Sequence, residues 1–306
     1  MAADALPPAE KKGSGRRGEP IREIRNLPDF ASGRRIITRD GGYRLIIDRQ
    51  NESSLLPPKG ETMEKKNVPY SSYDADKLDL YTPDQAGFDT VIVFHGGGLT
   101  NGSKSNLTYM KELTDAGYGV VNADYRMYPD AKYPDFIEDG AAAVRWAEEH
   151  VREYGGSGNL YVSGHSAGAY LTMMLCLSGQ YLDKAGVDRR FIKGYISDAA
   201  QVMTHFNVLK ERGLDSRLER IDEAAPIYWI SPETDFPKLL LIWYTEDIVC
   251  RPEENRLFLK SVERINPALR SKITACELEG KHCSGWKALP NGETPLYVRL
   301  LLDFMK

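Results

Sequence analysis

Cysteine is scarce in this chain, with four residues among 306. Cys176, Cys250, Cys276 and Cys283 are too few and too scattered for a disulfide scaffold, and they lack the paired Cys-x-x-Cys spacing of a structural zinc site. We therefore expect free thiols, with Cys176 in an apolar helix and Cys276 in a strand. Neither a metal nor a cofactor is expected.

A strong net charge is also absent, since 40 Lys and Arg stand against 44 Asp and Glu, for a formal charge of −4. A charge of this size favours neither nucleic acid nor a membrane surface as a partner. Residues 1–20 contain no apolar stretch of signal-peptide length, which indicates neither secretion nor a membrane anchor. The expected location is cytoplasmic, and the sequence leaves a homodimer open.

The chain divides into three stretches by composition. Residues 1–20 have almost nothing to bury and are predicted to be a disordered tail. Residues 21–66 are interpreted as an N-terminal extension, in which Asp40-Gly41-Gly42 between two apolar runs indicates a hairpin and Ser53–Glu64 a loop. Residues 67–306 are long enough, and the chain is apolar enough (42%), to form one large α/β domain.

Short apolar runs alternate with helical patterns through this third stretch. The predicted strands are Tyr70–Tyr73, Leu78–Tyr81, Val91–Phe94, Gly119–Asn122, Leu160–Ser163, Gly194–Ser197, Leu239–Trp243 and Ile273–Glu277. The predicted helices are a segment with Leu107, Met110 and Leu113 on one face, Pro134–His150, a run beginning near Ala167, Pro252–Ile265 and Pro295–Met305. This alternation predicts a mostly parallel sheet covered by helices on both faces, and residues 201–230 are expected to form a small cap.

Gly164-His165-Ser166-Ala167-Gly168 stands where a buried strand gives way to an apolar helix. A serine on such a sharp turn exposes its Oγ, and the glycines two residues before and after it leave room for the turn. The N-terminus of the following helix directs backbone N–H groups at an anion that forms beside the serine. The pattern predicts Ser166 as a nucleophile and the N–H of Ala167 as one donor of an oxyanion hole.

A glycine loop, His95-Gly96-Gly97-Gly98, follows directly on the apolar strand at 91–94. Three glycines could simply make a flexible loop, but a flexible loop is not expected directly after a buried strand and before Leu99. We expect the N–H groups of Gly97 and Gly98 to supply the other half of the oxyanion hole. His95 is expected to hold the loop rather than to catalyse.

The serine needs an imidazole that takes its proton and a carboxylate that orients the imidazole. In chains with a serine on this kind of strand-to-helix turn, the serine comes first in the sequence, then the acid, then the histidine. Of the five histidines, only His282 lies beyond every acid candidate. Asp247 is the favoured acid because it follows the strand at 239–243 by a short turn. Asp198, after the preceding strand, is the second choice, and Glu246 is interpreted as a bystander.

Together these motifs resemble the α/β-hydrolase-fold esterases, in particular the carboxylesterase branch near the hormone-sensitive lipases and the bacterial feruloyl and acetyl esterases. The likeness runs from about Asn67 to the C-terminus and includes Asp124-Tyr125-Arg126 and Tyr133-Pro134-Asp135. It implies an α/β-hydrolase fold with a small cap, and residues 67–306 as the catalytic domain. Ser166, Asp247 and His282 would be the triad, and Gly97, Gly98 and Ala167 the oxyanion donors.

The sequence departs from that family at three places. His165 stands where the hormone-sensitive-lipase group usually has Asp, which moves the likeness towards the feruloyl and acetyl esterases or the formamidases. Tyr244 stands where a glycine usually precedes the acid, so a differently shaped loop around Asp247 is expected. The segment before Asn67 has no family counterpart.

The expected reaction is the hydrolysis of a small carboxylic ester through an acyl-enzyme. Residues 201–230 mix Met203, Phe206 and Leu209 with many charged residues and lack the broad apolar lid of a lipase, so short acyl groups are expected. Two alternatives stay open: an amidase for an activated amide such as an aryl formamide, and a catalytically silent binding protein. The presence of His282 argues against the silent protein.

Overall fold

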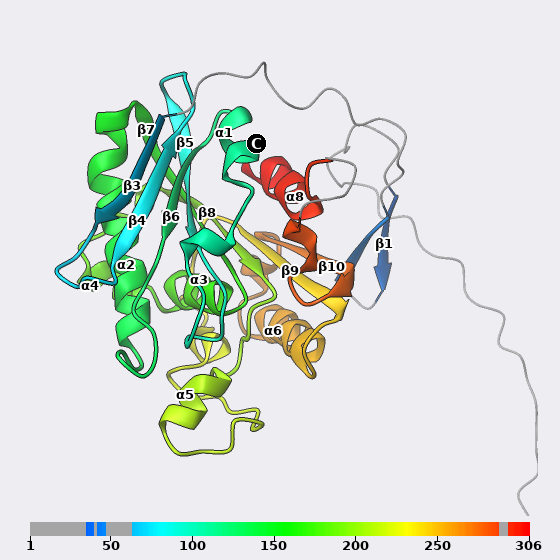
Figure 1. Ribbon diagram of the computed structural model, residues 1–306. Coiled ribbons are helices and arrows are strands. Elements are labelled where there is room, and N and C mark those ends of the chain that lie inside the picture. The colour runs from blue at the N-terminus through cyan, green and yellow to red at the C-terminus, as the bar shows by residue number, and fades with distance from the viewer. Residues whose placement is uncertain (1–34, 40–41, 47–62, 288–292) are drawn as a thin grey trace, which may run out of the picture.

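The computed structural model describes residues 35–39, 42–46, 63–287 and 293–306 (Figure 1). The predicted tail at 1–20 lies outside these residues, as does the predicted loop up to residue 62. The hairpin is confirmed, since β1 (Arg35–Arg39) pairs with β2 (Gly42–Ile46) in antiparallel register. β2 in turn pairs with a strand near the C-terminus, so this part of the chain joins the main sheet.

One sheet of ten strands forms the centre of the described residues, in the order β1-β2-β10-β9-β8-β7-β5-β6-β4-β3. The remaining strands are β3 (Met63–Pro69), β4 (Lys77–Thr82), β5 (Phe88–Phe94), β6 (Gly119–Ala123), β7 (Gly156–His165), β8 (Ile192–Asp198), β9 (Leu239–Glu246) and β10 (Ile273–Lys281). Strands from β2 to β6 in this order run parallel, and β1, β4 and β3 add antiparallel pairings at the two edges. The predicted, mostly parallel sheet is confirmed.

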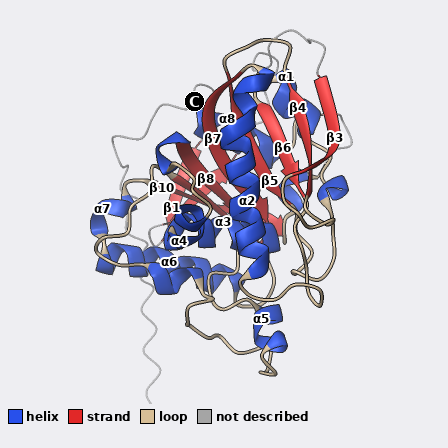
Figure 2. Cartoon of the chain, turned by 90° about the vertical axis from the view of Figure 1, so that its left-hand side faces the viewer, coloured by secondary structure: helices blue, strands red, loops and turns tan. Residues whose placement is uncertain are grey.

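Helices cover both faces of the sheet, as the continuous apolar runs of its central strands require. The α-helices are α1 (Met110–Asp115), α2 (Asp135–His150), α3 (Ala167–Ser178), α4 (Gln180–Lys184), α5 (Phe206–Glu211), α6 (Arg251–Ile265), α7 (Pro267–Arg270) and α8 (Leu296–Met305). Helices α2, α3 and α6 contribute to one apolar core and α1 and α8 to the other, on the opposite face (Figure 2). α3 is buried over nearly its whole length, which explains why its sequence is apolar on every side.

Two predicted elements lie elsewhere. The edge strand is β3 at Met63–Pro69 rather than Tyr70–Tyr73, because residues 70–76 fold into a turn. The Tyr70 amide donates to the Asp76 carbonyl at 3.1 Å, and the Ser71 hydroxyl donates to the Asp76 carboxylate at 2.5 Å. The first helix of the predicted series begins at Met110 rather than near Leu107, which ends a short 3-10 turn.

Residues 201–230 connect β8 to β9 and contain α5 and a 3-10 turn at Pro226–Trp229. In Figure 1, α5 lies below the sheet, apart from the helices that cover its two faces. Among the described helices, none is both long enough and apolar enough to cross a membrane. The boundary placed between residues 66 and 67 falls inside β3, and the division into an extension and a catalytic domain stays a prediction.

Candidate active site

Ser166 occupies the sharp turn between β7 and α3, with φ 53° and ψ −110°. Residues other than glycine rarely adopt this positive φ, and the surrounding packing holds Ser166 in this conformation. A Cβ on Gly164 would lie 2.2 Å from the Gly168 carbonyl oxygen, and a Cβ on Gly168 would lie 2.2 Å from the Phe94 carbonyl oxygen. Both positions therefore require glycine. The Ser166 amide donates to the Asp198 carbonyl at 2.8 Å, which fixes the turn to the end of β8.

His282 lies between Ser166 and Asp247. Its Nε2 is 2.8 Å from the Ser166 Oγ, and its Nδ1 contacts the Asp247 Oδ1. The His282 side chain is 24% exposed, whereas that of Asp247 is fully buried. The Asp247 carboxylate also accepts hydrogen bonds from the backbone amides of Ile248 at 2.7 Å and Tyr244 at 3.4 Å. This geometry lets a proton pass from the serine to an imidazole whose tautomer the carboxylate fixes.

The glycine loop runs directly beside the nucleophile, since a Cβ on Gly96 would lie 3.2 Å from the Ser166 Cβ. Gly97 has φ +120° and Gly98 has φ +65°, so the loop turns in a region that favours glycine. Within the described part of the chain, the amides of Gly97 and Gly98 donate no hydrogen bond. Two free N–H groups beside a serine are what an oxyanion hole needs.

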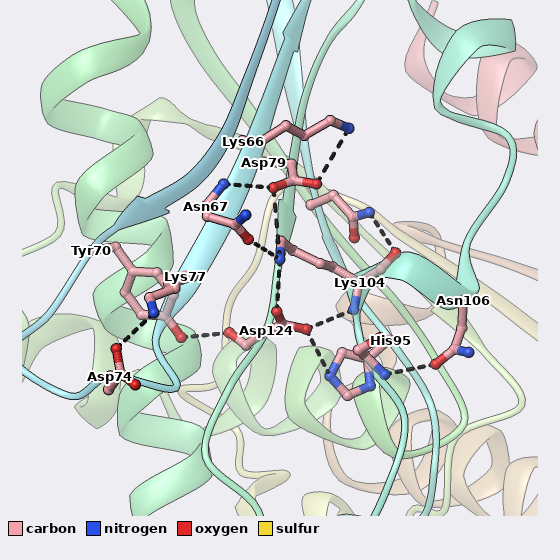
Figure 3. Close-up of polar contacts among 12 residues, drawn as sticks. Lys66, Asn67, Tyr70, Asp74, Lys77, Asp79, His95, Lys104, Asn106 and Asp124 are labelled. Atoms are coloured by element: carbon pink, nitrogen blue, oxygen red, sulfur yellow. Dashed lines mark hydrogen bonds and ion pairs between the residues drawn. The ribbon is translucent and has the colours of Figure 1, made fainter.

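A buried ionic network supports the glycine loop from behind (Figure 3). The Lys104 ammonium lies 3.0 Å from Asp124, 3.7 Å from Asp79 and 2.8 Å from the Asn67 amide oxygen. The Lys104 amide also donates to Asp124 at 2.6 Å. The Asp124 oxygen that accepts this amide, Oδ1, also lies 3.7 Å from the His95 Nε2. The network thus joins the start of the loop to strands β4 and β6.

His95 is wedged into this support rather than directed at the serine. Its Nδ1 lies 2.6 Å from the Gly96 carbonyl oxygen, and its ring stacks on Tyr125 with centroids 4.4 Å apart. The Tyr125 hydroxyl donates to the His95 carbonyl at 2.9 Å. Burial lowers the pKa of His95, so the ring favours its neutral form. The supporting role expected for His95 agrees with these contacts.

The other members of the Asp124-Tyr125-Arg126 motif are also structural. Arg126 forms a bidentate pair with Asp139 in α2, with an Nη2 to Oδ1 distance of 2.7 Å. Burial raises the pKa of Asp139 to about 6, against the opposing effect of Arg126. This pair fastens the segment after β6 to the helix that packs on the sheet.

Asp198, the second-choice acid, contacts a different histidine. Its Oδ2 lies 2.6 Å from the His165 Nδ1, and its Oδ1 accepts a hydrogen bond from the Tyr244 hydroxyl at 2.8 Å. The His165 Nε2 is 2.5 Å from the Tyr109 hydroxyl. All four side chains are buried. The structure therefore brings Asp247, and not Asp198, to His282.

Among the described residues, three metal-ligating side chains come together at His165, Asp198 and Cys283. Both ring nitrogens of His165 and both carboxylate oxygens of Asp198 already have hydrogen-bond partners, and the Cys283 Sγ lies 3.8 Å from the Asp198 carbonyl oxygen. Burial raises the pKa of the Cys283 thiol well above its ordinary value, which disfavours the thiolate that a metal would need. The residues do not fit a metal. The four cysteines are free, as expected.

Sequence reasoning missed residues that hold the glycine loop and the loop that carries His282. Lys104 gave no signal, because a lysine after a glycine loop usually faces solvent. The cap segment contributes Asn207, whose amide donates to the Gly98 carbonyl, and Phe206, whose ring tip would lie 3.1 Å from a Cβ on Gly98. A signal did exist for Tyr244, which departs from the family pattern.

Comparison with known proteins matches residues 78–196 to the family described as BD-FAE. Esterase LipI of Mycobacterium tuberculosis is 32% identical over 169 residues, which cover 54% of this chain and 48% of that protein. Kynurenine formamidase of Salmo salar is 28% identical over 251 residues, which cover 78% of this chain and 81% of that protein. The chain thus spans about half the length of LipI but most of the formamidase.

Solved structures share the fold. Esterase B from Lactobacillus Rhamnosis (HN001) superposes with a TM-score of 0.62 at 20% sequence identity. The superposition covers 83% of this chain and 86% of that one. Identity at this level establishes the architecture alone, and the site residues carry the functional argument.

Proposed function

We propose that this chain is a carboxylesterase of the α/β-hydrolase fold and hydrolyses small carboxylic esters through Ser166, His282 and Asp247. The observation that carries the proposal is the placement of the His282 ring, with Nε2 at 2.8 Å from the Ser166 Oγ and Nδ1 on the Asp247 carboxylate. A buried carboxylate, an oriented imidazole and a serine on a strained turn form an activated nucleophile.

The proposed reaction has two halves. The Ser166 oxygen attacks the ester carbonyl carbon while His282 takes its proton, and the N–H groups of Gly97, Gly98 and Ala167 hold the negative oxygen that forms. When this intermediate collapses, His282 returns the proton to the departing alcohol and an acyl-serine remains. Water then attacks the acyl carbon with His282 again as the base, which releases the acid and restores Ser166.

The expected preference for short acyl groups rests on the contact of the cap segment with the glycine loop. Phe206 and Asn207 at the start of α5 reach Gly98, so the cap closes over this side of the loop. Each methylene that entered an open apolar channel would add about 0.8 kcal/mol, and a closed wall removes that gain. We expect p-nitrophenyl acetate and butyrate to react fastest, and Phe206→Ala to move the optimum towards longer chains. Rates that climb steadily to long chains in the wild type would contradict the closed wall.

The nucleophile is tested directly with a fluorophosphonate probe. The probe should label the wild type and leave Ser166→Ala unlabelled, and the substitution should lower turnover by about six orders of magnitude. Ser163→Ala is a matched control, because Ser163 is a buried serine of β7, the strand that leads into the turn, and its Oγ bonds to the Tyr297 hydroxyl at 2.5 Å. Labelling of Ser166→Ala at another serine would overturn the assignment.

A second candidate, hydrolysis of an activated amide, rests on the likeness to kynurenine formamidase over 78% of this chain. The same nucleophile and the same oxyanion donors serve both reactions, so the leaving group distinguishes them. An aryl formamide assayed beside the ester panel decides between the two. A kcat/KM for the formamide above that of every ester would establish the amidase.

A further inference from the structure

Tyr244 has no role in the proposed reaction, yet its hydroxyl lies between Asp198 and Gly285. It belongs to β9, next to Asp247, and its side chain is fully buried. Its hydroxyl donates to the Asp198 Oδ1 at 2.8 Å and accepts a hydrogen bond from the Gly285 amide at 3.1 Å. Burial, with the nearby Asp198 carboxylate, raises the pKa of Tyr244 far above its ordinary value, so the hydroxyl keeps its proton and donates.

Asp198 connects this hydroxyl to the nucleophile. The Asp198 carbonyl accepts the Ser166 amide at 2.8 Å, and its carboxylate holds the ring of His165, the residue before the serine. The Tyr244 hydroxyl therefore forms a polar bridge between the serine turn and residues 282–286, which we call the histidine loop.

At its start the histidine loop is held by His282, which contacts Asp247 and Ser166, and the Cys283 thiol lies 3.8 Å from the Asp198 carbonyl oxygen. The register of β10 on β9 shifts between Leu278 and Lys281, so the loop leaves the sheet before His282. The Gly280 amide reaches Thr245 at 3.3 Å, just ahead of the loop. A Cβ on Gly285 would lie 2.7 Å from the Tyr244 hydroxyl oxygen, so the loop packs directly on this group.

We infer that Tyr244 is a positioning residue that sets the distance between the His282 imidazole and the Ser166 hydroxyl. The inference rests on the proposed function of these two residues. Without the hydroxyl, the Gly285 amide loses its acceptor and Asp198 loses a donor, so one polar link between the histidine loop and the serine turn is lost, while the contacts of His282 with Ser166 and of the Cys283 thiol with the Asp198 carbonyl remain. Misplacement of a base by a fraction of an ångström lowers the rate of proton transfer far more than it weakens substrate binding.

The test is Tyr244→Phe, which removes one oxygen and keeps the ring. We expect kcat to fall at least tenfold, KM to stay within twofold, and labelling by a fluorophosphonate to slow in parallel. Tyr161→Phe is the matched control, because Tyr161 is also a buried tyrosine of the sheet and its hydroxyl bonds to the Met305 carbonyl at 3.0 Å, at the C-terminus. It should keep kcat within twofold. Equal kcat values for the two variants, with both folded, would overturn the inference.

A double-mutant cycle tests the contact without any activity. Gly285→Ala forces a methyl group against the Tyr244 hydroxyl, whereas the nearest ring carbons lie 3.6 Å away. Gly285→Ala should therefore lower the unfolding midpoint in the wild type and cost much less in the Tyr244→Phe background. Additive effects on stability would contradict the direct contact. An inactive and unlabelled wild type would overturn the proposed function instead, while leaving the stability cycle to judge Tyr244.

Discussion

In the described residues, two histidines hydrogen-bond through Nδ1 to an aspartate near the carboxyl ends of β8 and β9, and the two pairs differ in exposure and in the partner of Nε2. His282 pairs with Asp247 after β9, is 24% exposed and presents its Nε2 to Ser166. His165 pairs with Asp198 at the end of β8, is 2% exposed and presents its Nε2 to Tyr109. A base needs a reacting group to face, so under the proposed function the third partner distinguishes His282, which faces Ser166, from His165, which faces the buried Tyr109.

The first way to break this comparison is to remove each imidazole. His282→Ala should lower kcat by about 10⁶-fold, because no other side chain contacts the Ser166 Oγ in the described residues. His165→Asn should retain most of the activity of the folded fraction, since an amide can still donate to Asp198. Steady-state kinetics on protein shown to be folded by circular dichroism measures both. A folded, fully inactive His165→Asn would mean that the buried pair takes part in the chemistry.

The carboxylates sharpen the comparison. Asp247→Asn should lower kcat by about 10⁴-fold with little change in stability, since the imidazole loses its orienting charge. Asp198→Asn should act mainly on folding, at a cost of about 3 kcal/mol in the free energy of unfolding, because it breaks a buried pair. Urea unfolding and kinetics on the same samples separate the two effects. A stable but inactive Asp198→Asn beside a healthy Asp247→Asn would reverse the assignment of the acid.

Lys104 tests the support behind the glycine loop. Lys104→Met leaves Asp79 and Asp124 without their shared cation, so we expect the free energy of unfolding to fall by about 2–3 kcal/mol and kcat to fall about tenfold. Lys111→Met is the control, because the Lys111 side chain is 63% exposed and its pair with Asp115 should contribute less than about 1 kcal/mol. Equal losses of stability in the two variants would show that the network does not support the loop.

The smallest expected effect concerns Glu254, which anchors the segment after β8. Its carboxylate accepts the Val202 amide at 3.0 Å, and burial raises its pKa to about 7. The folded protein therefore holds a proton that the unfolded chain has lost, and this contribution to stability disappears as the pH rises from about 4.5 to about 7. Glu254→Gln should remove a decline on the order of 2 kcal/mol across that window, as measured by urea unfolding at several pH values.

The exposed neighbour Glu253 provides the control for this measurement. Its side chain is 69% exposed, so Glu253→Gln should leave the pH dependence of unfolding unchanged. An unaltered decline in Glu254→Gln would assign the pH dependence to other buried acids, of which Asp139 is the first candidate.

The sequence alone determined the order of strands and helices, the parallel sheet and the position of the serine turn. These features follow from local chemistry. Continuous apolar runs such as Val91–Phe94 have to be buried on both faces, and the glycines flanking Ser166 permit a turn that other residues would block. The predicted strand at Tyr70–Tyr73 was wrong for the complementary reason, because hydrogen bonds to Asp76 and Asp124 override the local preference there.

Only the tertiary structure decided which acid meets which histidine. Asp198 and Asp247 both follow parallel strands, and the sequence could rank them but not separate them. The distinction arises from contacts between segments far apart in the chain: Asp198 with His165 and Tyr244, and Asp247 with His282. A side chain's local sequence does not encode the partner that its hydrogen bond will find across the fold, and burial then makes that partner obligatory.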